Sequence, residues 1–552
     1  MFGKMFSHTF SNIDVSKTVR AVAILAMVLA SVLLGRVPLN AQTVTGIVKN
    51  SSGEPQVGAL VRVGSADTGL TFLVVSQAQG RYRTPNLKPG KYTVQGFGGL
   101  LQSAPSGPVE VKSGAEAKMD VVLANPRKTP PPPEKIMSDA DYAKLMPDGD
   151  GKRLLLSRCV ICHSTDERVG PRRTSREEWQ KTVTKMGLLL RERRVPVTDD
   201  EEKAMVDYLA KNFGPDNPPY RERHTPDPNE HFPAKLLQGT EAKYVAMELD
   251  LRALAGAFDI AVDSQGIAWV SEEKRGAGML GRFDPKTLTY TRIAVPPGKV
   301  PRGLGAIAVD SQDHVWLADN NPNFQLFEYN PKAQQFTAYD MPVGPAGTGA
   351  DINTIRFLDG NVWGTGTTSG RLVKLDPRTR KTTVFPVNQG SLPYGMAVGG
   401  DKMIWYVGSY DRAVIRLDPS TGKITPYKVP IRGYLLRRMG ADAEGNLWVG
   451  ALEASKLLKV EYATGKITEF SPPTPNAGPR CIDVDLKRNR IWFNEHGADK
   501  MGRFDPTTNT YAEFPLPNVE NDGRRIQVDP SNPNRVWWDA RIGRIGYVEV
   551  LE

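Results

Sequence analysis

The sequence has few cysteines and shows no disulfide framework. Three cysteines occur in 552 residues, and two of them, Cys159 and Cys162, stand close together. Cys481 is left without a partner in the chain. A protein with no disulfide is stabilised by the size of its core or by a bound group. Cys481 itself is interpreted as a small, buried apolar residue.

Long apolar runs are missing after the first 41 residues. Basic residues precede an apolar run at 21–35, and Ala41 offers a small residue for cleavage before Gln42. This run of about 15 residues is short for a membrane span, which needs roughly 20. We therefore predict a signal peptide at residues 1–41, with a retained N-terminal anchor as the alternative. The expected location is the periplasm or another site outside the cytoplasm, and no later segment is expected to span a membrane.

The sequence also lacks a dense basic stripe. The net charge of +10 is spread over a long chain. This modest excess favours acidic partners. The lack of a dense basic stripe argues against nucleic acid as a ligand.

Residues 42–124 are predicted to form a small all-β domain. Apolar and polar residues alternate in four segments, 45–48, 59–63, 91–94 and 118–123, separated by Gly and Pro. The motifs Gly80-Arg81-Tyr82 and Leu87-Lys88-Pro89-Gly90 resemble the carboxypeptidase regulatory-like family. The resemblance implies a prealbumin-like β-sandwich that packs or binds and cuts no bond.

A Pro-rich segment at 125–136 comes after this domain. Its four consecutive prolines, Pro130–Pro133, favour a stiff polyproline II rod, so we expect the sandwich to be held apart from the domains beyond the rod. A helical domain is predicted at 137–215. A second Pro-rich linker at 216–242 leads to the last domain, 243–552.

The strongest local motif is Cys159-Val160-Ile161-Cys162-His163. Two thiols three positions apart on one helical turn can add to the two vinyl groups of a haem, and His163 then lies beneath the iron as its proximal ligand. Such haems are normally attached outside the cytoplasm, which agrees with the predicted export. A redox dithiol or half a zinc site would be the alternatives, but a second Cys pair is missing. We predict one covalent haem c.

The helices around the motif are expected to be those of a small cytochrome c. Capping motifs at Ser175–Glu178 and Thr198–Glu201 open two amphipathic helices. Residues 150–214 resemble the cytochrome c domains that are fused to periplasmic oxidoreductases, in which a downstream Met supplies the sixth ligand. The resemblance implies Met186, with Met205 in reserve because it falls within the closing helix. A Met on an apolar helix face is otherwise a simple core residue.

From residue 243 onward the chain repeats itself every 42 to 47 residues. Seven tryptophans mark the repeats: Trp269, Trp316, Trp363, Trp405, Trp448, Trp492 and Trp537. A period of about 40–50 residues with four short strands per repeat predicts a seven-bladed β-propeller. The last repeat has three strands, so we expect Tyr244–Asp250 to pair with it as the fourth. The predicted fold is therefore multidomain and mainly β.

Blade six carries Trp492-Phe493-Asn494-Glu495, and then Gly502-Arg503-Phe504-Asp505-Pro506. These repeats resemble the virginiamycin B (streptogramin) lyase-like propellers, whose hallmark is such a run. In that family two Glu and a His are linked to metal-assisted elimination. This sequence has Arg480 where the His is expected, and its one nearby histidine is His496. The resemblance therefore implies the fold. The departure at Arg480 argues against streptogramin lyase activity.

Equivalent repeat positions predict a polar site at one end of the central channel. Three acidic residues stand three positions after a repeat Trp: Glu272, Asp319 and Glu495. They could hold Mg²⁺ or Ca²⁺. Three arginines share a second position: Arg437, Arg480 and Arg524. They could clamp a carboxylate or phosphate. Alternatively, these charges line a solvated channel and pair with one another.

Three functions fit these features. The first is electron transfer, with haem reduced by a partner protein or a small-molecule donor and a propeller that binds substrate or partner. The second is a metal-dependent lyase or hydrolase centred on the propeller, with Glu495, His496 and Arg480 as candidate catalytic residues. The third is a non-catalytic sensor or binding protein for an anionic, saccharide-type or protein ligand. The haem motif favours the first, within a periplasmic oxidoreductase.

Overall fold

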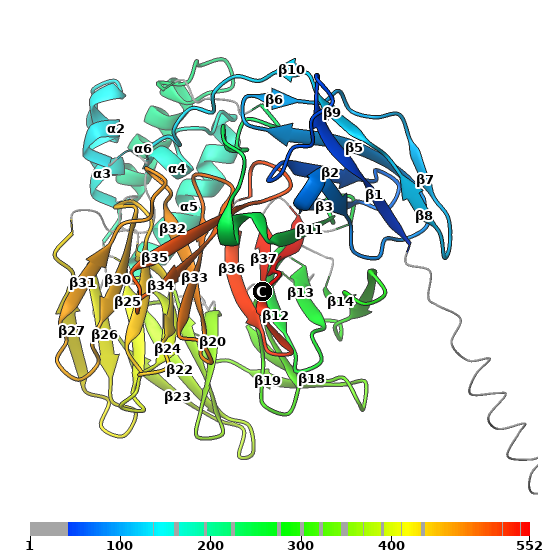
Figure 1. The fold of residues 1–552 in the computed structure, drawn as a ribbon. Helices are drawn as coiled ribbons and strands as arrows, with labels where there is room; N and C mark the ends of the chain where they lie inside the picture. The colour runs from blue at the N-terminus through cyan, green and yellow to red at the C-terminus, as the bar shows by residue number, and fades with distance from the viewer. Residues whose placement is uncertain are drawn as a thin grey trace, which may run out of the picture.

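The computed structural model describes most of residues 42–552. The gaps are 136, 138, 159–164, 193–195, 222–226, 255, 273–277, 299–302, 320–323, 344–351, 368, 388–390, 410, 432–435, 522 and 541–542. The described chain is multidomain and mainly β, with a sandwich-like domain, a group of helices and propeller-like sheets (Figure 1). The predicted signal peptide lies outside the described residues. No described helix is both long enough and apolar enough to cross a membrane.

The N-terminal domain is a sandwich of two sheets around an apolar core. Its strands are β1 (Thr43–Asn50), β2 (Leu60–Gly64), β3 (Leu70–Val75), β4 (Arg81–Arg83), β5 (Gly90–Gly98), β6 (Leu101–Gln102), β7 (Val109–Val111), β8 (Glu116–Lys118), β9 (Val121–Leu123) and β10 (Asn125–Pro126), with a 3-10 turn, η1 (Ala78–Gly80). One sheet has the order β4-β1-β8, with β9 also on β1. The other begins β10-β6-β5-β2-β3, with β7 also on β5.

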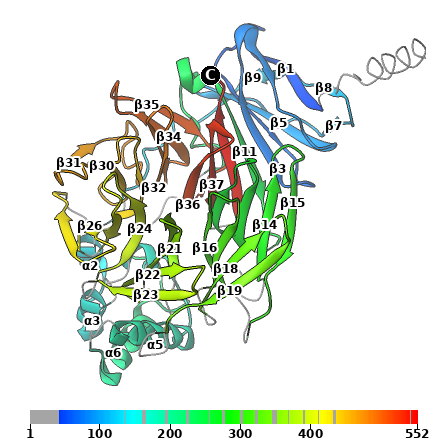
Figure 2. The same ribbon diagram turned by 90° about the horizontal axis from the view of Figure 1, so that it is seen from below.

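The propeller has seven blades of four strands in the described chain; six are separate sheets, and the seventh is part of a larger sheet. The first six, in chain order, are β12 (Ala257–Val262), β13 (Ala268–Glu272), β14 (Met279–Asp284), β15 (Thr289–Ala294); β16 (Leu304–Val309), β17 (Val315–Asp319), β18 (Gln325–Asn330), β19 (Gln335–Asp340); β20 (Ile352–Leu358), β21 (Asn361–Gly366), β22 (Arg371–Asp376), β23 (Lys381–Pro386); β24 (Pro393–Val398), β25 (Ile404–Gly408), β26 (Ala413–Leu417), β27 (Ile424–Lys428); β28 (Leu436–Ala441), β29 (Leu447–Ala451), β30 (Lys456–Val460), β31 (Ile467–Phe470); and β32 (Pro479–Asp485), β33 (Arg490–Glu495), β34 (Lys500–Asp505), β35 (Thr510–Pro515). The first strands of neighbouring blades pack on one another around the whole ring, so they line its centre (Figure 2).

The seventh blade is closed by a strand from before the first blade. It comprises β36 (Gly523–Asp529), β37 (Asn532–Ala540), β38 (Arg544–Val550) and β11 (Tyr244–Asp250), which comes after a 3-10 turn, η3 (Gly239–Ala242). β11 runs antiparallel to β38, with Met247 opposite Tyr547. The prediction that Tyr244–Asp250 completes the last blade is confirmed.

The sandwich is not held apart from the propeller, so the prediction of a separated domain is wrong. The other edge of β11 pairs with β3, so Met247 also lies opposite Phe72. One continuous sheet therefore runs from β10 in the sandwich to β36 in the propeller. The physical reason is that β11 would otherwise expose an unpaired strand edge, which this pairing covers. The polyproline segment also contacts the propeller, because Asn476 Nδ2 donates to Pro133 O at 2.9 Å.

In five of the blades, a hydrogen bond from the Trp indole explains the Asp that stands before the Trp. In blade one the Trp269 indole Nε1 donates to Asp263 Oδ2 at 2.9 Å, and in blade five Trp448 does the same to Asp442 at 2.9 Å. Each Asp also accepts backbone N–H groups of its own turn. The motif thus joins the turn to the core and satisfies an indole that burial would otherwise leave without an acceptor.

The helical region has its own small core. Its helices are α2 (Asp139–Leu145), α3 (Asp150–Arg158), α4 (Thr165–Arg168), α5 (Arg176–Glu192) and α6 (Asp199–Asn212). Thr198 and Glu201 form the predicted reciprocal capping box of α6. At α5, Ser175 Oγ accepts from Glu178 N at 3.3 Å. Figure 2 shows the helices and the sandwich toward opposite sides of the propeller.

Candidate functional site

The predicted haem attachment residues lie between two helices. Cys159, Cys162 and His163 fall within 159–164, outside the described residues. α3 ends directly before this segment, and α4 begins directly after it. The exit is fixed because Thr165 N donates to Asp139 Oδ1 at 2.6 Å, across to α2. One helix thus leads into the motif, and another helix follows it.

The helix before the motif crosses α6 at very short range. A Cβ on Gly151 would meet the Cβ of Tyr208 at 2.2 Å and the carbonyl oxygen of Ala204 at 2.7 Å. Tyr208 in turn donates from its hydroxyl to Pro147 O at 2.6 Å. This crossing requires glycine, and it sets the position from which α3 enters the motif.

Gly151→Ala is therefore expected to loosen the helical region. The new methyl group must displace α6 backbone, which costs about 1–3 kcal/mol. Amide hydrogen exchange in α3 and α6 should rise, while exchange in the propeller stays unchanged. Gly107→Ala is the control, since its added Cβ would meet nothing within 4 Å. Unchanged exchange in α3 and α6 would contradict this account of the crossing.

The two candidate axial methionines have different surroundings. Met205 is 2 % exposed and belongs to the core with Val206 and Leu209. Met186 on α5 is half-buried and is not among the described residues of that core. The predicted apolar face of α5 holds for Trp179, but Met186 lies at its margin. Packing therefore already accounts for Met205, and Met186 keeps a partly open side chain.

Every innermost strand of the propeller has an irregularity near its start. The register of pairing shifts between Ala257 and Asp259 in blade one, and at the equivalent place in the other six blades. A bulge changes the direction in which a side chain points, compared with regular strand pairing. The repeat position that the sequence singled out, with Arg437, Arg480 and Arg524, falls in these bulges. We call the end of the central channel where they lie the channel mouth.

The three carboxylates that were predicted to hold a cation do not come together in the described part of the chain. Glu272 is buried and paired within its own blade: Arg292 Nη2 lies 2.6 Å from Glu272 Oε2, and the Tyr290 hydroxyl donates to Oε1 at 3.1 Å. Asp319 accepts from Gly303 N at 3.3 Å. In the described part of the chain, Glu272, Asp319 and Glu495 are not among the groups whose ligand atoms all lie within 4.8 Å of one another. Glu272, at the end of a second strand, reaches toward the outer strand of its own blade.

Glu495 in blade six is as deeply buried as Glu272. Its carboxylate is 1 % exposed, and burial, together with the smaller effect of the Glu513 charge, holds its pKa well above the ordinary value. Lys500 pairs with Glu513 at 2.8 Å, and Thr474 Oγ1 also donates to Glu513. Glu495 therefore favours its neutral form beside this pair, which does not suit a cation ligand.

The predicted arginines do come together at the channel mouth. Arg437 and Arg438 lie against the ring of Tyr394, and the charges of Arg480 and Arg524 also act to lower the pKa of Tyr394; we call these four arginines the arginine cluster. The guanidinium carbons of Arg437 and Arg438 lie 5.1 and 5.3 Å from the centre of the Tyr394 ring. Arg524 stacks on Phe258 at 3.8 Å. Arg438 is a member that the sequence reasoning missed.

One position deeper, the charges pair with one another. Asp259 is fully buried, and its Oδ2 lies 3.4 Å from Arg525 Nη1 and 3.8 Å from Arg438 Nη2. Burial, together with the charge of Asp259, raises the pKa of Asp539 to about 8. The alternative of mutually paired channel charges thus holds for this second ring. A repeat alignment shows these positions, but it does not show which of them face each other.

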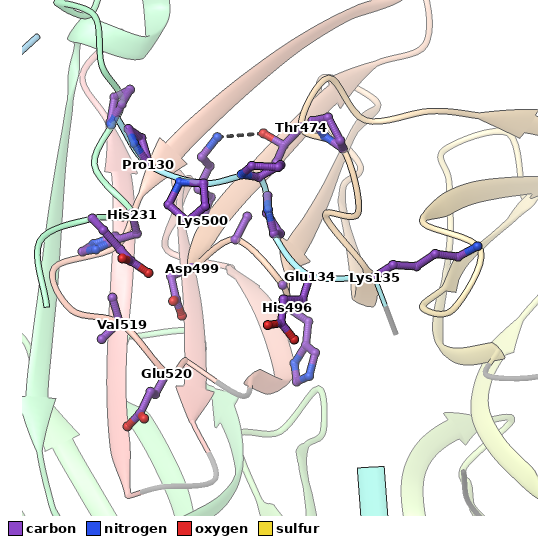
Figure 3. Close-up of a pocket in the computed structure, with 18 of the residues that line it drawn as sticks. Pro130, Glu134, Lys135, His231, Thr474, His496, Asp499, Lys500, Val519 and Glu520 are labelled. Atoms are coloured by element: carbon purple, nitrogen blue, oxygen red, sulfur yellow. Dashed lines mark hydrogen bonds between the residues drawn. The ribbon is translucent and has the colours of Figure 1, made fainter. Parts of the chain in front are cut away.

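A cavity of about 850 Å³ lies where the linkers, the helical region and blade six meet. Pro130–Pro133 line one side, Asp166 contributes from α4, and His496 and Asp499 line the propeller side (Figure 3). Burial raises the pKa of Asp499 to about 6. The cavity connects His496, a predicted catalytic candidate, with the helix directly after the haem motif.

Family comparisons divide the chain into three parts. Residues 43–124 match the carboxypeptidase regulatory-like domain, and residues 289–551 match the virginiamycin B lyase family. The chain carries a regulatory-like sandwich and a lyase-like propeller. Residues 149–224 match the haem-binding domain described as quinohemoprotein amine dehydrogenase A, alpha subunit. This match includes the whole Cys159–His163 motif.

Solved structures agree with the propeller fold. A streptogramin B lyase shares 23 % identity, with a TM-score of 0.50, and the alignment covers 57 % of this chain and 100 % of that one. Virginiamycin B lyase from Staphylococcus aureus shares 24 % identity, with a TM-score of 0.49 over 56 % of this chain and 100 % of its own. At this identity the likeness concerns the fold alone. A search of curated proteins found no match.

Proposed function

We propose that this protein is an exported electron-transfer protein that carries one covalent haem c and uses its propeller to bind a substrate or a redox partner. The observation that carries the proposal is the Cys159-Cys162-His163 motif within a match to a haem-binding domain. The apolar run at 21–35 supports export because it is typical of a signal peptide. Export agrees with a haem c, which is normally attached outside the cytoplasm.

The residues present fit a haem c. The thiols of Cys159 and Cys162 and the imidazole of His163 would hold the group, and Met186 on α5 would offer a thioether to it. Haem c, when bound, exchanges single electrons. The protein's own contribution would be to hold the group: α3 ends directly before the motif, α4 begins directly after it, and α5 and α6 contribute to the apolar core of the same region.

The cavity of about 850 Å³ where the linkers, the helical region and blade six meet supports an approach route for an electron donor. Asp166 stands two residues after the segment 159–164, and it lines the same cavity as His496 of blade six. Arg221 bonds Asp166 at 2.7 Å and also contacts Glu134 of the linker, which ties the helical region to the cavity wall. A small molecule in this cavity would lie between the propeller and α4, the helix that follows the haem motif in the sequence.

Reduction of the purified holoprotein tests this function. A panel of small-molecule donors and reduced periplasmic proteins should include one that reduces the haem, as monitored by its absorption bands under anaerobic conditions. A bulky substitution in the cavity wall, Ala498→Trp, should slow reduction by a small donor that uses the cavity, whereas Ala333→Trp on a distant turn should not. Reduction by dithionite alone, with no effect of any other donor, would contradict the proposal.

A further inference from the structure

We propose that blade two of the propeller carries a binding site for a divalent transition-type metal ion, with zinc as the best fit, formed by Asp310, His314 and Glu328. The oxygen and nitrogen atoms that these side chains offer all lie within 4.8 Å of one another. Asp310 and His314 belong to the turn between β16 and β17, and Glu328 lies on β18. The proposal does not depend on the haem, because its residues all belong to the propeller.

Blade two departs from the other blades at the residue that lies opposite its Trp. The third strand of five other blades places a basic residue there: Arg282, Lys374, Arg416, Lys459 and Arg503. In blade two, Trp316 lies opposite Glu328. A position that carries a cation in five blades thus carries an anion in this one.

The basic residue at this position pairs with the Asp that accepts the indole hydrogen bond. In blade four, Arg416 Nε lies 2.6 Å from Asp401 Oδ2. In blade five, Lys459 Nζ lies 3.8 Å from Asp442 Oδ2. In these blades the chain itself supplies a positive charge beside the buried or half-buried carboxylate.

Blade seven shows how the fold treats two acidic residues in this region. Arg535 bridges them, because its Nη1 lies 3.6 Å from Asp529 Oδ2 and its Nη2 lies 2.6 Å from Glu549 Oε2. Arg535 and His314 each stand two residues before the Trp of their blade. His314 thus occupies the position of a bridging cation, and its imidazole is a common metal ligand.

The two carboxylates of blade two are held in place by neutral donors. Asp310 accepts from the Trp316 indole at 2.8 Å and from backbone N–H groups of its turn, and Glu328 accepts from the Tyr339 hydroxyl at 2.8 Å. His314 Nδ1 lies 2.6 Å from Glu328 Oε1. Within the described residues, no Lys or Arg forms an ion pair with Asp310 or Glu328. The positive charge that other blades supply from the chain is therefore missing here.

Solvent can reach the site. The side chains of His314 and Glu328 are 19 % and 20 % exposed, so an ion can enter while neighbouring groups hold the ligands. Arg380 of blade three lies over the Tyr339 ring, 4.8 Å from its centre, and donates to Ala338 O. This arginine is engaged beside the site and leaves the two carboxylates to an external cation.

One imidazole and two carboxylates suit zinc better than calcium. Zn²⁺ takes His nitrogen and carboxylate oxygen at about 2.0–2.2 Å in four-coordinate sites, whereas Ca²⁺ takes about six to eight oxygen ligands. Small rotations bring three atoms within 4.8 Å of one another onto such an ion, and water from the exposed side completes the coordination. The bound ion then takes the place of the Lys or Arg of the other blades and joins β18 to the turn before β17.

Zinc titration of the tag-free holoprotein, freed of metals by EDTA, tests the site. By equilibrium dialysis and metal analysis, wild type should bind one zinc ion that Glu328→Arg does not bind. This variant restores the residue type of five other blades, so blade two should fold without metal. Hydrogen exchange at 310–328 should fall when zinc is added to wild type and stay unchanged in Glu328→Arg.

His314→Gln should weaken zinc binding by about 100-fold or more, because the loss of an outer partner of a metal ligand already costs about 10–100-fold. Glu110→Gln, which removes an exposed carboxylate of the sandwich, should bind zinc as wild type does. Equal zinc binding by wild type and Glu328→Arg, no zinc binding by wild type at millimolar concentration, or tighter binding of Ca²⁺ than of Zn²⁺ would overturn the proposal.

Discussion

Replacing both Cys159 and Cys162 with alanine is expected to abolish covalent haem attachment. Each thiol would supply one thioether bond to the porphyrin, so the double variant would keep only the bonds of His163 and Met186 to the iron, which acid breaks. Protein made in cells that mature cytochromes should then lose all of its haem on acid–acetone extraction. Wild-type protein should retain it.

Cys481 provides the matched control. Its thiol is fully buried on β32, and its Sγ lies 3.6 Å from Gly523 O. Burial also raises the pKa of this thiol to about 12, so it stays protonated and unreactive. The sequence-based interpretation of a small buried residue is confirmed. Cys481→Ala should keep its covalent haem, and retention of haem by the Cys159/Cys162 double variant would contradict the assignment.

Met186→Ala is expected to change the haem electronically and leave it attached. Loss of a thioether ligand should remove the weak absorption band at about 695 nm of the oxidised protein and lower the reduction potential by on the order of 0.1 V or more, since axial ligands span about 0.8 V. The band is read in the oxidised protein, and the potential by redox titration.

Met205→Ala separates ligation from packing. Its side chain lies in the core of the helical region, so the substitution should destabilise that region by about 2–5 kcal/mol and leave the band in place. The reverse pattern, with the band kept in Met186→Ala and lost in Met205→Ala, would show that the reserve ligand is the true one.

The propeller could be predicted because its signal is repeated. Each blade has a Trp, which recurs every 42 to 47 residues, and in five blades an Asp four to eight positions earlier accepts a hydrogen bond from its indole. The closing strand β11 was also predictable, because a three-stranded last repeat leaves an edge that needs a partner.

The union of sandwich and propeller was not predicted. β3 is a run of mostly apolar residues, Leu70–Val75, which is typical of a strand buried on both faces. That pattern was a usable signal for a strand in mid-sheet, but it does not specify the partner. The pairing of β3 with β11 joins segments about 170 residues apart, and local sequence carries no information on such a contact.

The site was predicted in part, for a similar reason. Repeat alignment finds which residues share a position, so the arginines of the channel mouth were identified. The direction of a side chain depends on register and bulges, so the alignment showed neither the pairing of Glu272 with Arg292 nor the place of Arg438 beside Tyr394. The haem motif itself could be recognised from sequence, because its five residues are contiguous.

Intact-protein mass spectrometry, combined with peptide mapping, tests the central claim most directly. Protein purified from cells that mature cytochromes should carry the mass of one haem, and the added mass should map to the peptide that contains Cys159 and Cys162. A chain of unmodified mass from such cells, or a haem mapped to any other peptide, would contradict the account.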